Sequence, residues 1–471
     1  MNSVPPPIPP LVRAHRRRRA ALAVGAAAVL TSALTVGFQH AAQAADTLLS
    51  QDRIVTVSST QVSGTPGNAA VDSDSTTRWA SAATDHEWIM IDLSATSAIT
   101  RVHLQWEAAY AKAFQLQTSA DAVTWTTIYS TTTGTGGTQD LNVSGTGRYV
   151  RMNGIQRGTG YGYSLYEFQV YGSQPGAPAP GGPGYILANP QVTGVTPSHA
   201  TPPNAYFHEF QANCSANHTL PDDPIVFPGQ AGASHMHTFM GNKATTANST
   251  TVASFEAGGT TCLAPGDKSG YWMPTMYNGN TAILPIGPQV IYYKTNLIDY
   301  TSVRPFPKGL RYLVGSPGNN ATQFIQESYE GWECGDSYYN ADFPASCPAG
   351  TQLNVRFQAP SCWDGKYLDT PDHKSHMAYP VDGRCTIGHP VALPMIEFKM
   401  ALPVSGDLSQ VRLSSGRGYS FHYDFFNDWD DPTLAALVTH CIDGGLQCDA
   451  RGYDQNHPEK GAVLNDQYLL P

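Results

Sequence analysis

The stretch SCWDGKYLDTPDHKSHMAYP, residues 361–380, has no helical periodicity, and two of its three carboxylates lie close in sequence to two histidines. Imidazole titrates near neutral pH, and a neighbouring carboxylate can orient it or share its proton. Asp369, Asp372, His373 and His376 are therefore candidates for acid–base chemistry. The alternative is a loop in which these polar groups only hydrogen-bond one another.

Two shorter motifs carry the same residue types. SHMHTF contains His235 and His237, and GYSFHYDFFNDW contains His422 and Asp424. One residue separates the members of each pair, so on a strand both side chains of a pair point to the same face. LPDDPIVFPGQ and the predicted strand in DKSGYWMPTMY complete the candidate catalytic set with Asp222, Asp223 and Tyr271.

These residue types support three interpretations. In the first, which is our working hypothesis, paired acids cleave a glycosidic bond, or a histidine and a tyrosine serve a lyase. In the second, imidazoles and a carboxylate bind zinc or copper. The ligands would then come from His235, His237, His376 and His422, with Asp424 or Asp372. In the third, the histidines hold loops in place by hydrogen bonds.

Cysteine usage indicates an oxidising compartment. All eight cysteines lie after residue 200, and an even number in an exported chain predicts disulfides. Pairing each cysteine with its nearest neighbour in sequence gives four bridges. The bridge between Cys362 and Cys385 would fix the central histidine loop, which a pre-organised site requires.

The N-terminus has the form of a secretory signal peptide. A basic cluster (16–19) precedes an apolar run and the small-residue ending AQA, so we expect cleavage after Ala44 and a secreted, extracellular protein. Five of the 27 Lys and Arg residues lie in this segment and none of the 37 Asp and Glu residues does, which leaves 22 positive against 37 negative charges, or −15. Such a chain does not attract nucleic acid or an anionic membrane surface.

Composition also places the domain boundaries. SQPGAPAPGGPG is uncharged and rich in Pro and Gly, which is typical of a linker. We therefore expect a signal peptide (1–44), a first domain (46–172), a linker (173–186) and a C-terminal domain (187–471). The clearest helix is predicted at 430–441, where Asp and Pro precede an apolar face.

The sequence of the first domain predicts a series of short strands. WIMIDLSATSAITRVHL, WTTIYS, RYVRMNGI and LYEFQVYG alternate apolar and polar residues. With NAAVDSDSTTRWAS before EWIMIDL and YSLYEFQVYG at its end, this domain resembles the discoidin family, or coagulation factor V/VIII C-type domain, especially its family 32 carbohydrate-binding branch. The resemblance implies a jelly-roll β-sandwich with binding loops at one end.

The resemblance also implies a structural calcium ion, because loop oxygens suit a hard cation. Its ligands would be Asp72, Asp74, Thr77 and Glu167. Aromatic rings beside a carboxylate can stack on sugar rings and accept hydroxyl hydrogen bonds. The candidate glycan contacts are Trp106, Glu107, Tyr110, Tyr161 and Tyr163.

The C-terminal domain resembles the family called domain of unknown function 1996. The matching motifs are DDPIVFPGQAGASHMHTFMGN, DKSGYWMPTMY, APSCWDGKYLDTPDHKSHMAYP, CTIGHPVALPMIEF and GYSFHYDFFNDWD. Fungal relatives often carry sugar-binding modules beside this domain, so the resemblance points to polysaccharides. We expect a disulfide-rich, predominantly β domain with few helices.

The sequence thus predicts a mainly β, secreted, monomeric protein whose partner is an extracellular polysaccharide of a fungal or bacterial cell wall. Its N-terminal module would bind this polymer. Its C-terminal domain would cleave it, as a glycoside hydrolase rather than a lyase or a metal-dependent hydrolase. The alternative is a non-catalytic wall-binding protein whose histidine clusters are structural.

Overall fold

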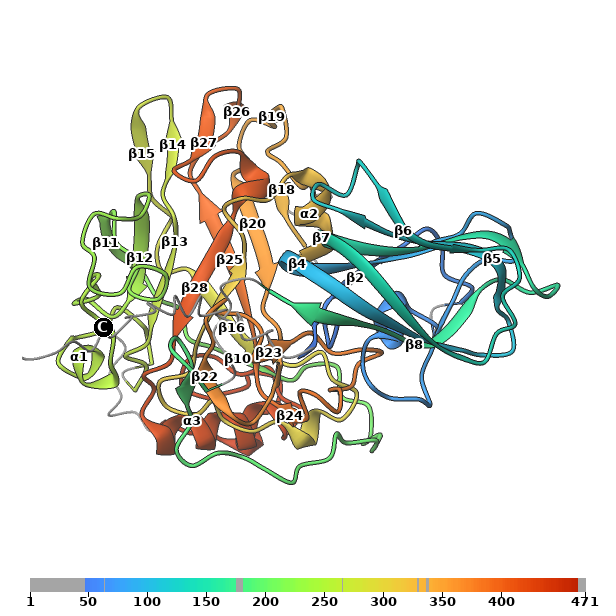
Figure 1. The fold of residues 1–471 in the computed structure, drawn as a ribbon. Coiled ribbons are helices and arrows are strands. Elements are labelled where there is room, and N and C mark those ends of the chain that lie inside the picture. Colours follow the sequence, from blue (N-terminus) through green and yellow to red (C-terminus); the bar gives the residue numbers. More distant parts are fainter. Residues whose placement is uncertain are drawn as a thin grey trace, which may run out of the picture. The chain divides into compact units, whose positions relative to one another are not determined.

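The computed structural model describes residues 47–62, 64–174, 181–264, 266–327, 330–335 and 339–464 (Figure 1). The predicted signal peptide (1–44) and residues 175–180 of the predicted linker lie outside the described residues. The described chain is mainly β, as predicted, and its α-helices are short.

The N-terminal module is an antiparallel arrangement of eight strands in the order β1-β8-β4-β7-β5-β6, with β2 paired to β4 and β3 to β8. The strands are β1 (Thr47–Leu48), β2 (Ile54–Val57), β3 (Trp79–Ala80), β4 (Trp88–Trp106), β5 (Ala111–Ser119), β6 (Thr126–Thr131), β7 (Thr138–Arg157) and β8 (Ser164–Ser173). This is the jelly-roll class expected from the sequence.

Alternation along the strands builds the core of this module. In β4 the apolar side chains at every second position are buried, while the residues between them are more exposed. Trp79, Phe114 and Phe168 fill the centre. The alternation along β4 therefore gathers its apolar side chains on one face, which the fold buries.

The C-terminal domain is built on two antiparallel five-stranded sheets. One has the order β11-β12-β13-β28-β17, and we call it the site sheet; the other has the order β10-β16-β25-β20-β18. The strands of the site sheet are β11 (Ala216–Leu220), β12 (His237–Gly241), β13 (Gly270–Pro274), β17 (Arg311–Gly315) and β28 (His422–Phe426). The strands of the second sheet are β10 (Glu209–Gln211), β16 (Val290–Lys294), β18 (Trp332–Cys334), β20 (Leu353–Gln358) and β25 (Met395–Leu402).

Aromatic side chains join the two sheets. Phe398 of β25 stacks on Tyr423 of β28, with 3.8 Å between ring centroids and 11° between planes. Tyr271 of β13 also contacts Phe398, at 6.0 Å. Strands β13, β28, β20 and β25 accordingly run close together in Figure 1. One face of the site sheet therefore packs against the second sheet in the core.

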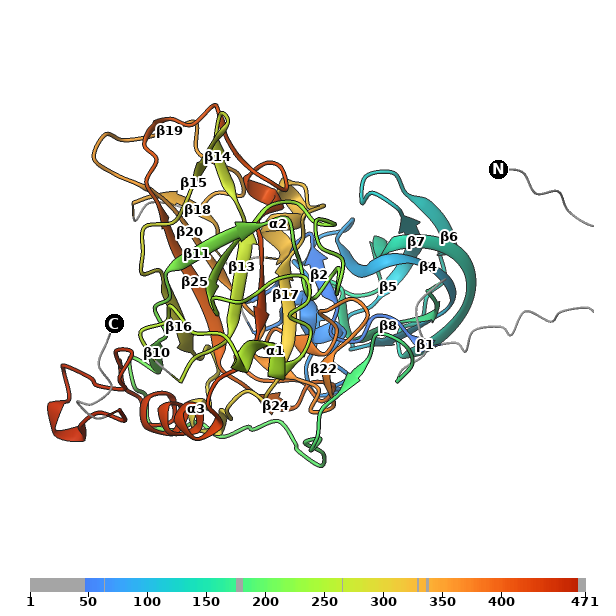
Figure 2. The ribbon, with the colours of Figure 1, turned by 90° about the vertical axis from the view of Figure 1, so that its left-hand side faces the viewer.

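The opposite face of the site sheet has a small apolar cluster of its own. Phe239 and Trp272 lie 5.6 Å apart there, and Phe255 of helix α1 (Val252–Glu256) stacks on Phe426 at 4.3 Å. Figure 2 shows α1 beneath the ends of β13 and β17. This cluster leaves the other end of the same face to polar residues.

The remaining elements are small. They are the strands β9 (Ile186–Leu187), β14 (Met276–Asn278), β15 (Thr281–Ile283), β19 (Ser346–Cys347), β21 (Cys362–Trp363), β22 (Tyr367–Asp369), β23 (Met377–Ala378), β24 (Val391–Ala392), β26 (Gly406–Asp407) and β27 (Val411–Leu413), and the helices α2 (Ala321–Glu327) and α3 (Asp431–Leu437). The short helical turns are η1 (Gly67–Ala70), η2 (Tyr300–Ser302), η3 (Gly418–Ser420), η4 (Val438–Ile442) and η5 (Pro458–Lys460).

The C-terminal domain contains four disulfides. Each links a cysteine to the next cysteine along the chain, as predicted. They are Cys214–Cys262, Cys334–Cys347, Cys362–Cys385 and Cys441–Cys448. The predicted helix at 430–441 is also confirmed: Asp430 caps α3 by accepting a hydrogen bond from the Thr433 N–H. Within the described residues, no helix combines the length and apolar character that crossing a membrane requires.

Candidate functional site

Polar residues gather on the outer face of the site sheet. Side chains alternate along a strand, so His237 shares this face with Phe239, and His422 shares it with Asp424. The register pairs Asp424 with Trp272 of β13. Two motifs almost 190 residues apart in sequence are therefore brought to one place by strands β12, β13 and β28.

The loop between β11 and β12 covers this face. Asp223 Oδ1 accepts hydrogen bonds from two backbone N–H groups of the turn that follows it, at 3.0 and 2.9 Å, which fixes the carboxylate. Asp222 accepts from the N–H groups of Gly232 and Ala247, at 2.9 and 3.0 Å. The Asp222 carboxylate thus anchors the loop, whereas Asp223 belongs to the cluster.

Three imidazoles meet at this point. His237 Nδ1 donates to the main-chain oxygen of Asp222 at 2.9 Å, and His422 Nδ1 donates to that of Ser420 at 3.0 Å. Their Nε2 atoms then face each other at 3.4 Å. The His235 ring lies 4.3 Å from the His237 ring and 5.0 Å from the His422 ring, between centroids.

Burial keeps all three imidazoles neutral. It lowers the pKa of His235 to about 4 and that of His422 to about 3, the latter helped by the charge of His235. The pKa of fully buried His237 falls well below its usual value for the same reasons. Each ring therefore keeps a lone pair, as a base or a metal ligand requires.

Asp424 is the most unusual group of the cluster. It is 0% exposed, and neither of its carboxylate oxygens has a hydrogen-bond partner among the described residues. Burial, and then the charge of Asp223, raise its pKa well above the usual range, while Lys374 opposes this in part. Burial likewise raises the pKa of Asp223. Such a group needs a proton or a cation beside it.

The loop that follows β22 brings one more predicted residue to the cluster. His373 Nδ1 lies 2.8 Å from Asp369 Oδ1, and the Leu313 N–H of β17 donates to the His373 carbonyl oxygen at 2.9 Å. Burial alone would lower the pKa of His373, but the hydrogen bond and charge of Asp369, and the charge of Asp223, raise it. Asp369 thus orients His373 beside Asp223.

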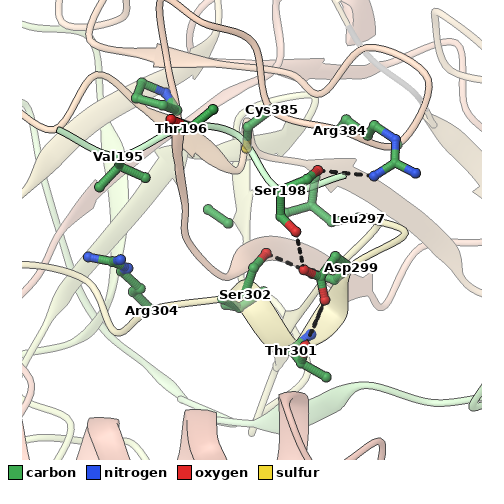
Figure 3. Close-up of a pocket in the computed structure, with 14 residues that line it drawn as sticks. Val195, Thr196, Ser198, Leu297, Asp299, Thr301, Ser302, Arg304, Arg384 and Cys385 are labelled. Atoms are coloured by element: carbon green, nitrogen blue, oxygen red, sulfur yellow. Dashed lines mark hydrogen bonds between the residues drawn. The ribbon is translucent and has the colours of Figure 1, made fainter. Parts of the chain in front are cut away.

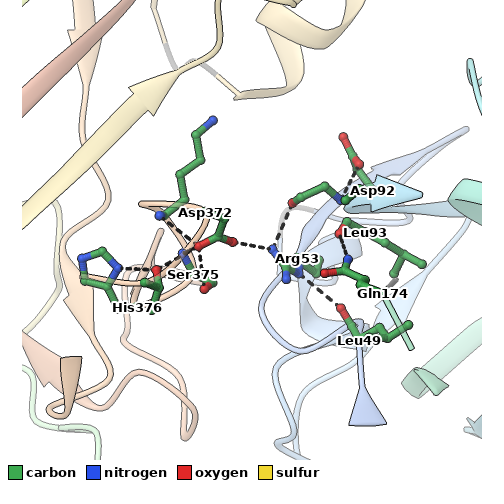
Figure 4. Close-up of polar contacts among 12 residues, drawn as sticks. Leu49, Arg53, Asp92, Leu93, Gln174, Asp372, Ser375 and His376 are labelled. Carbon is green, nitrogen blue, oxygen red and sulfur yellow. Dashed lines mark hydrogen bonds and ion pairs between the residues drawn. The ribbon is translucent and has the colours of Figure 1, made fainter. Parts of the chain in front are cut away.

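The other two residues of this loop hold it together. Asp372 Oδ1 accepts from the Ser375 N–H at 3.0 Å and from its hydroxyl at 2.8 Å, and Arg53 Nη1 lies 3.6 Å from Asp372 Oδ2 (Figure 4). His376 is buried between the Thr370 hydroxyl and the Arg311 carbonyl oxygen, both at 2.9 Å. The expectation that His376 shares the site with the other histidines is wrong, because both of its ring nitrogens are occupied elsewhere.

Tyr271 is also absent from the cluster. It is fully buried on the core face of β13, where its hydroxyl donates to Asp267 at 2.7 Å and lies 2.6 Å from that of Tyr293. Trp272, the next residue, faces the cluster instead. Adjacent residues on a strand face opposite sides, so only one of Tyr271 and Trp272 can reach the site. The sequence already indicated this restriction.

Sequence reasoning also missed Lys374, whose charge acts on both His422 and Asp424. The structure brings together His235, His237, His422, Asp424, Asp223 and His373. It gives supporting positions to Asp222, Asp369, Asp372 and His376, and a core position to Tyr271.

In the N-terminal module, two of the predicted calcium ligands, Asp72 and Glu167, are buried close enough for their charges to interact, and we call this group the acidic pocket. Glu167 has no hydrogen-bond partner for either oxygen, and Asp72 accepts from the Thr77 hydroxyl at 2.7 Å. Burial, and then the charge of Asp72, raise the pKa of Glu167 to about 8; burial raises the pKa of Asp72 to about 7. The Asp74 carboxylate instead accepts from the N–H and hydroxyl of Thr76.

The acidic pocket also includes a residue that the sequence did not indicate. Asp52 raises the pKa of both Asp72 and Glu167 by its charge. Among the described residues, no group of three His, Cys, Asp or Glu side chains with ligand atoms within 4.8 Å of one another includes Asp72, Asp74 or Glu167. A cation here would therefore need other oxygens in addition, such as the Thr77 hydroxyl or a main-chain carbonyl group.

The predicted glycan contacts divide into two groups. Tyr161 is 69% exposed, and the Glu107 and Tyr110 side chains are half-buried. Trp106 and Tyr163 are 4% and 0% exposed, so neither can offer its ring to a glycan, and this part of the prediction is wrong. Trp106 follows Val102 and Leu104 in the buried register of β4, a pattern that the sequence already contained.

A separate cavity of about 280 Å³ lies beside the Cys362–Cys385 bridge (Figure 3). Asp299 is its carboxylate, and it accepts hydrogen bonds from the Ser198 and Thr301 hydroxyls. Arg384 donates to the Ser198 carbonyl oxygen at 3.0 Å. These polar groups satisfy one another, and none of the predicted site residues lines the cavity.

Two family models match separate parts of the chain. The family described as F5/8 type C domain matches residues 54–168, and the family described as domain of unknown function (DUF1996) matches residues 223–429. No curated protein matched the chain.

Two solved structures from Paenibacillus sp. IK-5 are similar to the N-terminal module. A selenomethionine-labelled variant of chitosan-binding module 1 of a chitosanase/glucanase is 47% identical, and the match covers 27% of this chain and 99% of that module, with a TM-score of 0.26. Module 2 of the same enzyme, solved with chitotriose, is 44% identical over 26% of this chain and 99% of that module, with a TM-score of 0.26. Residues 54–168 are therefore similar to the F5/8 type C family, and residues 223–429 are similar to the DUF1996 family.

Proposed function

We propose that this protein binds chitosan or a closely related glucosamine polymer through its N-terminal module. The observation that carries the proposal is the 47% identity to a chitosan-binding module over 99% of that module. Charge supports it as well, because the chain after residue 44 has 22 basic against 37 acidic residues, and chitosan carries ammonium groups.

Tyr161, Tyr110 and Glu107 supply the proposed contacts. An exposed tyrosine ring can lie against a sugar face or below its ammonium group, and a carboxylate can pair with that ammonium group. Tyr161 is the ring that solvent reaches most easily of these three residues. The remaining candidates, Trp106 and Tyr163, serve the core of the module instead.

Co-sedimentation of the full mature chain with insoluble chitosan, chitin and cellulose tests this proposal. We expect retention on chitosan that weakens as salt is added, since salt screens exposed charges. Tyr161→Ala should reduce retention, whereas Tyr206→Ala, a control that removes an 88% exposed tyrosine of the C-terminal domain, should not. Equal retention on all three polymers, or none, would exclude chitosan as the preferred partner.

We further propose that the C-terminal domain cleaves the bound polymer by hydrolysis. Support comes from the Asp369–His373 pair, whose imidazole interacts with the charge of Asp223, and from the nearness of Asp223 to His237 and Asp424. His373 is oriented by Asp369 and partly exposed, so it can take a proton from water; Asp223, whose pKa is raised, can hold a proton for the leaving oxygen.

Product release by the full mature chain tests the cleavage. We expect short oligosaccharides with reducing ends from chitosan, detected by mass spectrometry, and none from His373→Gln. The amide side chain of Gln retains hydrogen bonding without the titration of imidazole. If wild type binds the polymer but releases no product from any glucosamine polymer, the protein is a non-catalytic binding protein.

Two further parts of the proposal concern the setting of this chemistry. A calcium ion held by Asp72, Glu167 and Thr77, with main-chain oxygen from Asp74, would compensate the buried charge of the acidic pocket. Export by the N-terminal signal agrees with the four disulfides, since such bridges persist in oxidising compartments.

A further inference from the structure

The imidazole cluster of the C-terminal domain has the properties of a metal centre. The ligand atoms of His235, His237 and His422 all lie within 4.8 Å of one another, and so do those of Asp223, His237 and Asp424. We propose that His235, His237 and His422 bind one transition-metal ion of the zinc class, with the Asp424 carboxylate held beside it. The assignment stands on this geometry and does not depend on the proposed cleavage.

The distance between two of the ring nitrogens fits shared coordination. Zinc binds histidine nitrogen at about 2.0–2.1 Å, so two such ligands at a tetrahedral angle lie about 3.3 Å apart. The Nε2 atoms of His237 and His422 lie 3.4 Å apart. This is the separation that one ion between the two rings would produce.

In the part of the chain that the structure describes, the facing Nε2 atoms of His237 and His422 have no hydrogen-bond partner apart from each other. Each Nδ1–H donates to a main-chain carbonyl oxygen, of Asp222 for His237 and of Ser420 for His422. In a neutral ring the Nε2 atom is then an acceptor only, and two acceptors cannot hydrogen-bond each other. Metal-binding histidines typically have this arrangement, in which the outer nitrogen is fixed by a carbonyl group.

Asp424 provides an independent argument. It is fully buried, and both of its oxygens lack a hydrogen-bond partner among the described residues. A water molecule could accept or donate hydrogen bonds here but would leave the carboxylate charge uncompensated. Protonation would remove the charge yet leave a buried hydroxyl without an acceptor. A divalent cation beside Asp424 satisfies both requirements.

The donor types select the metal. Imidazole nitrogens with a neighbouring carboxylate suit zinc and similar transition metals, whereas calcium and magnesium prefer sites made of oxygen. No cysteine of the chain is free to compete as a ligand. Three histidine ligands leave a fourth position, which is the composition of hydrolytic zinc sites.

The metal would also have a role in the proposed hydrolysis. This role, unlike the metal site itself, rests on the proposed function. A bound cation makes a coordinated water more acidic and so supplies the nucleophile that hydrolysis needs. His235, the half-buried member of the three, marks the side from which water reaches the ion. His373 would take the proton of that water, and Asp223 would keep its role as proton donor to the leaving oxygen.

Metal analysis of the full mature chain, prepared without a histidine tag, tests the assignment. We expect about one zinc-class ion per chain, its removal by a strong chelator, and its replacement by Zn²⁺ or Co²⁺ in a titration. His237→Ala and His422→Ala should weaken Zn²⁺ binding at least about 100-fold, because each removes a ligand. His199→Ala, a control that removes an exposed histidine of the C-terminal domain outside the cluster, should bind the ion like wild type.

Each outcome decides the question. A folded wild type that neither contains nor takes up Zn²⁺ or Co²⁺ overturns the proposal, as does undiminished binding by both alanine variants. If those variants fail to fold, X-ray absorption of the zinc-loaded wild type replaces them: imidazole scattering near 2.0–2.1 Å supports the site, and its absence overturns it. Metal content is read without any glycan, so its failure is distinguishable from a failure of cleavage.

Discussion

If calcium binds the acidic pocket of the N-terminal module as proposed, its binding should depend strongly on pH. Without a cation, burial raises the pKa of Glu167 from 4.5 to about 8 and that of Asp72 from 3.8 to about 7. Both side chains are therefore largely protonated at pH 6. Calcium requires their ionised forms, so binding must displace these protons.

The size of this effect follows from the two pKa values. For a ligand that must lose a proton, the apparent dissociation constant rises by the factor 1 + 10^(pKa − pH), the usual linkage relation. From pH 8 to pH 6 this factor changes about 50-fold for Glu167 and about tenfold for Asp72. Calcium binding should therefore be about 500-fold weaker at pH 6 than at pH 8. Carboxyl groups with unshifted pKa values would give almost no change over this interval.

Isothermal titration of the mature chain with Ca²⁺ at pH 6, 7 and 8 measures this dependence. In buffers of different ionisation enthalpy, we expect release of about two protons per ion at pH 6 and about 0.6 at pH 8. Glu167→Gln should reduce the pH dependence to about tenfold or less, because one titrating ligand is gone. A dissociation constant that changes less than fivefold between pH 6 and pH 8 would refute the reasoning.

The same two pKa values predict the opposite pH dependence for the stability of the cation-free protein, which should fall as the pH rises. Its native state holds these two protons more tightly than the unfolded chain does, so the stabilising effect is complete below about pH 4. It is lost as the pH rises through about 7 and 8. Thermal unfolding with a chelator should therefore occur at a lower temperature at pH 8 than at pH 6, and saturating Ca²⁺ should remove most of this difference.

Three further predictions concern the glycan contacts, the proton-transfer pair and the central loop. Tyr161→Ala should weaken binding to soluble chitosan oligosaccharides about 2- to 5-fold, the equivalent of about 0.5–1 kcal/mol for a cation over an exposed ring; unchanged affinity in a titration would exclude this ring as a contact. Asp369→Asn should lower the raised pKa of His373, so the acidic limb of a cleavage–pH profile and the imidazole NMR titration should both move to lower pH; an unmoved titration would show that Asp369 does not set this pKa. Replacing Cys362 and Cys385 by serine opens a loop of 23 residues and should destabilise it by about 3 kcal/mol. Faster proteolysis and hydrogen exchange within residues 364–384 would confirm that loss, and unchanged protection would contradict it.

The local pattern of the sequence was sufficient for several features. Alternating apolar residues predicted the strands of the N-terminal module, and the Asp-Pro start with its apolar face predicted helix α3. The four disulfides join sequence neighbours, so local distance along the chain was enough to pair them. Each of these features depends on residues within a few turns or strands of one another, which is why a single sequence reveals them.

The sequence also indicates which residues of a strand share a face, although this pattern is easily misread. Trp106 continues the buried positions Val102 and Leu104, and Tyr271 and Trp272 must face opposite sides because they are adjacent. Alternation states which residues share a face. It does not state which face meets the core, because that depends on the sheet packed against it.

Only the tertiary structure decided which of the polar residues meet. His237 and His422 come together because β12 and β28 both pair with β13, and this pairing joins segments far apart in sequence. The same folding directs His376 to the Arg311 carbonyl oxygen, although His373, three residues earlier, lies beside Asp223. Residue types and spacing determined that this chain had the groups for acid–base or metal chemistry. Long-range strand pairing and burial determined which groups share one environment, because both depend on contacts that local sequence does not encode.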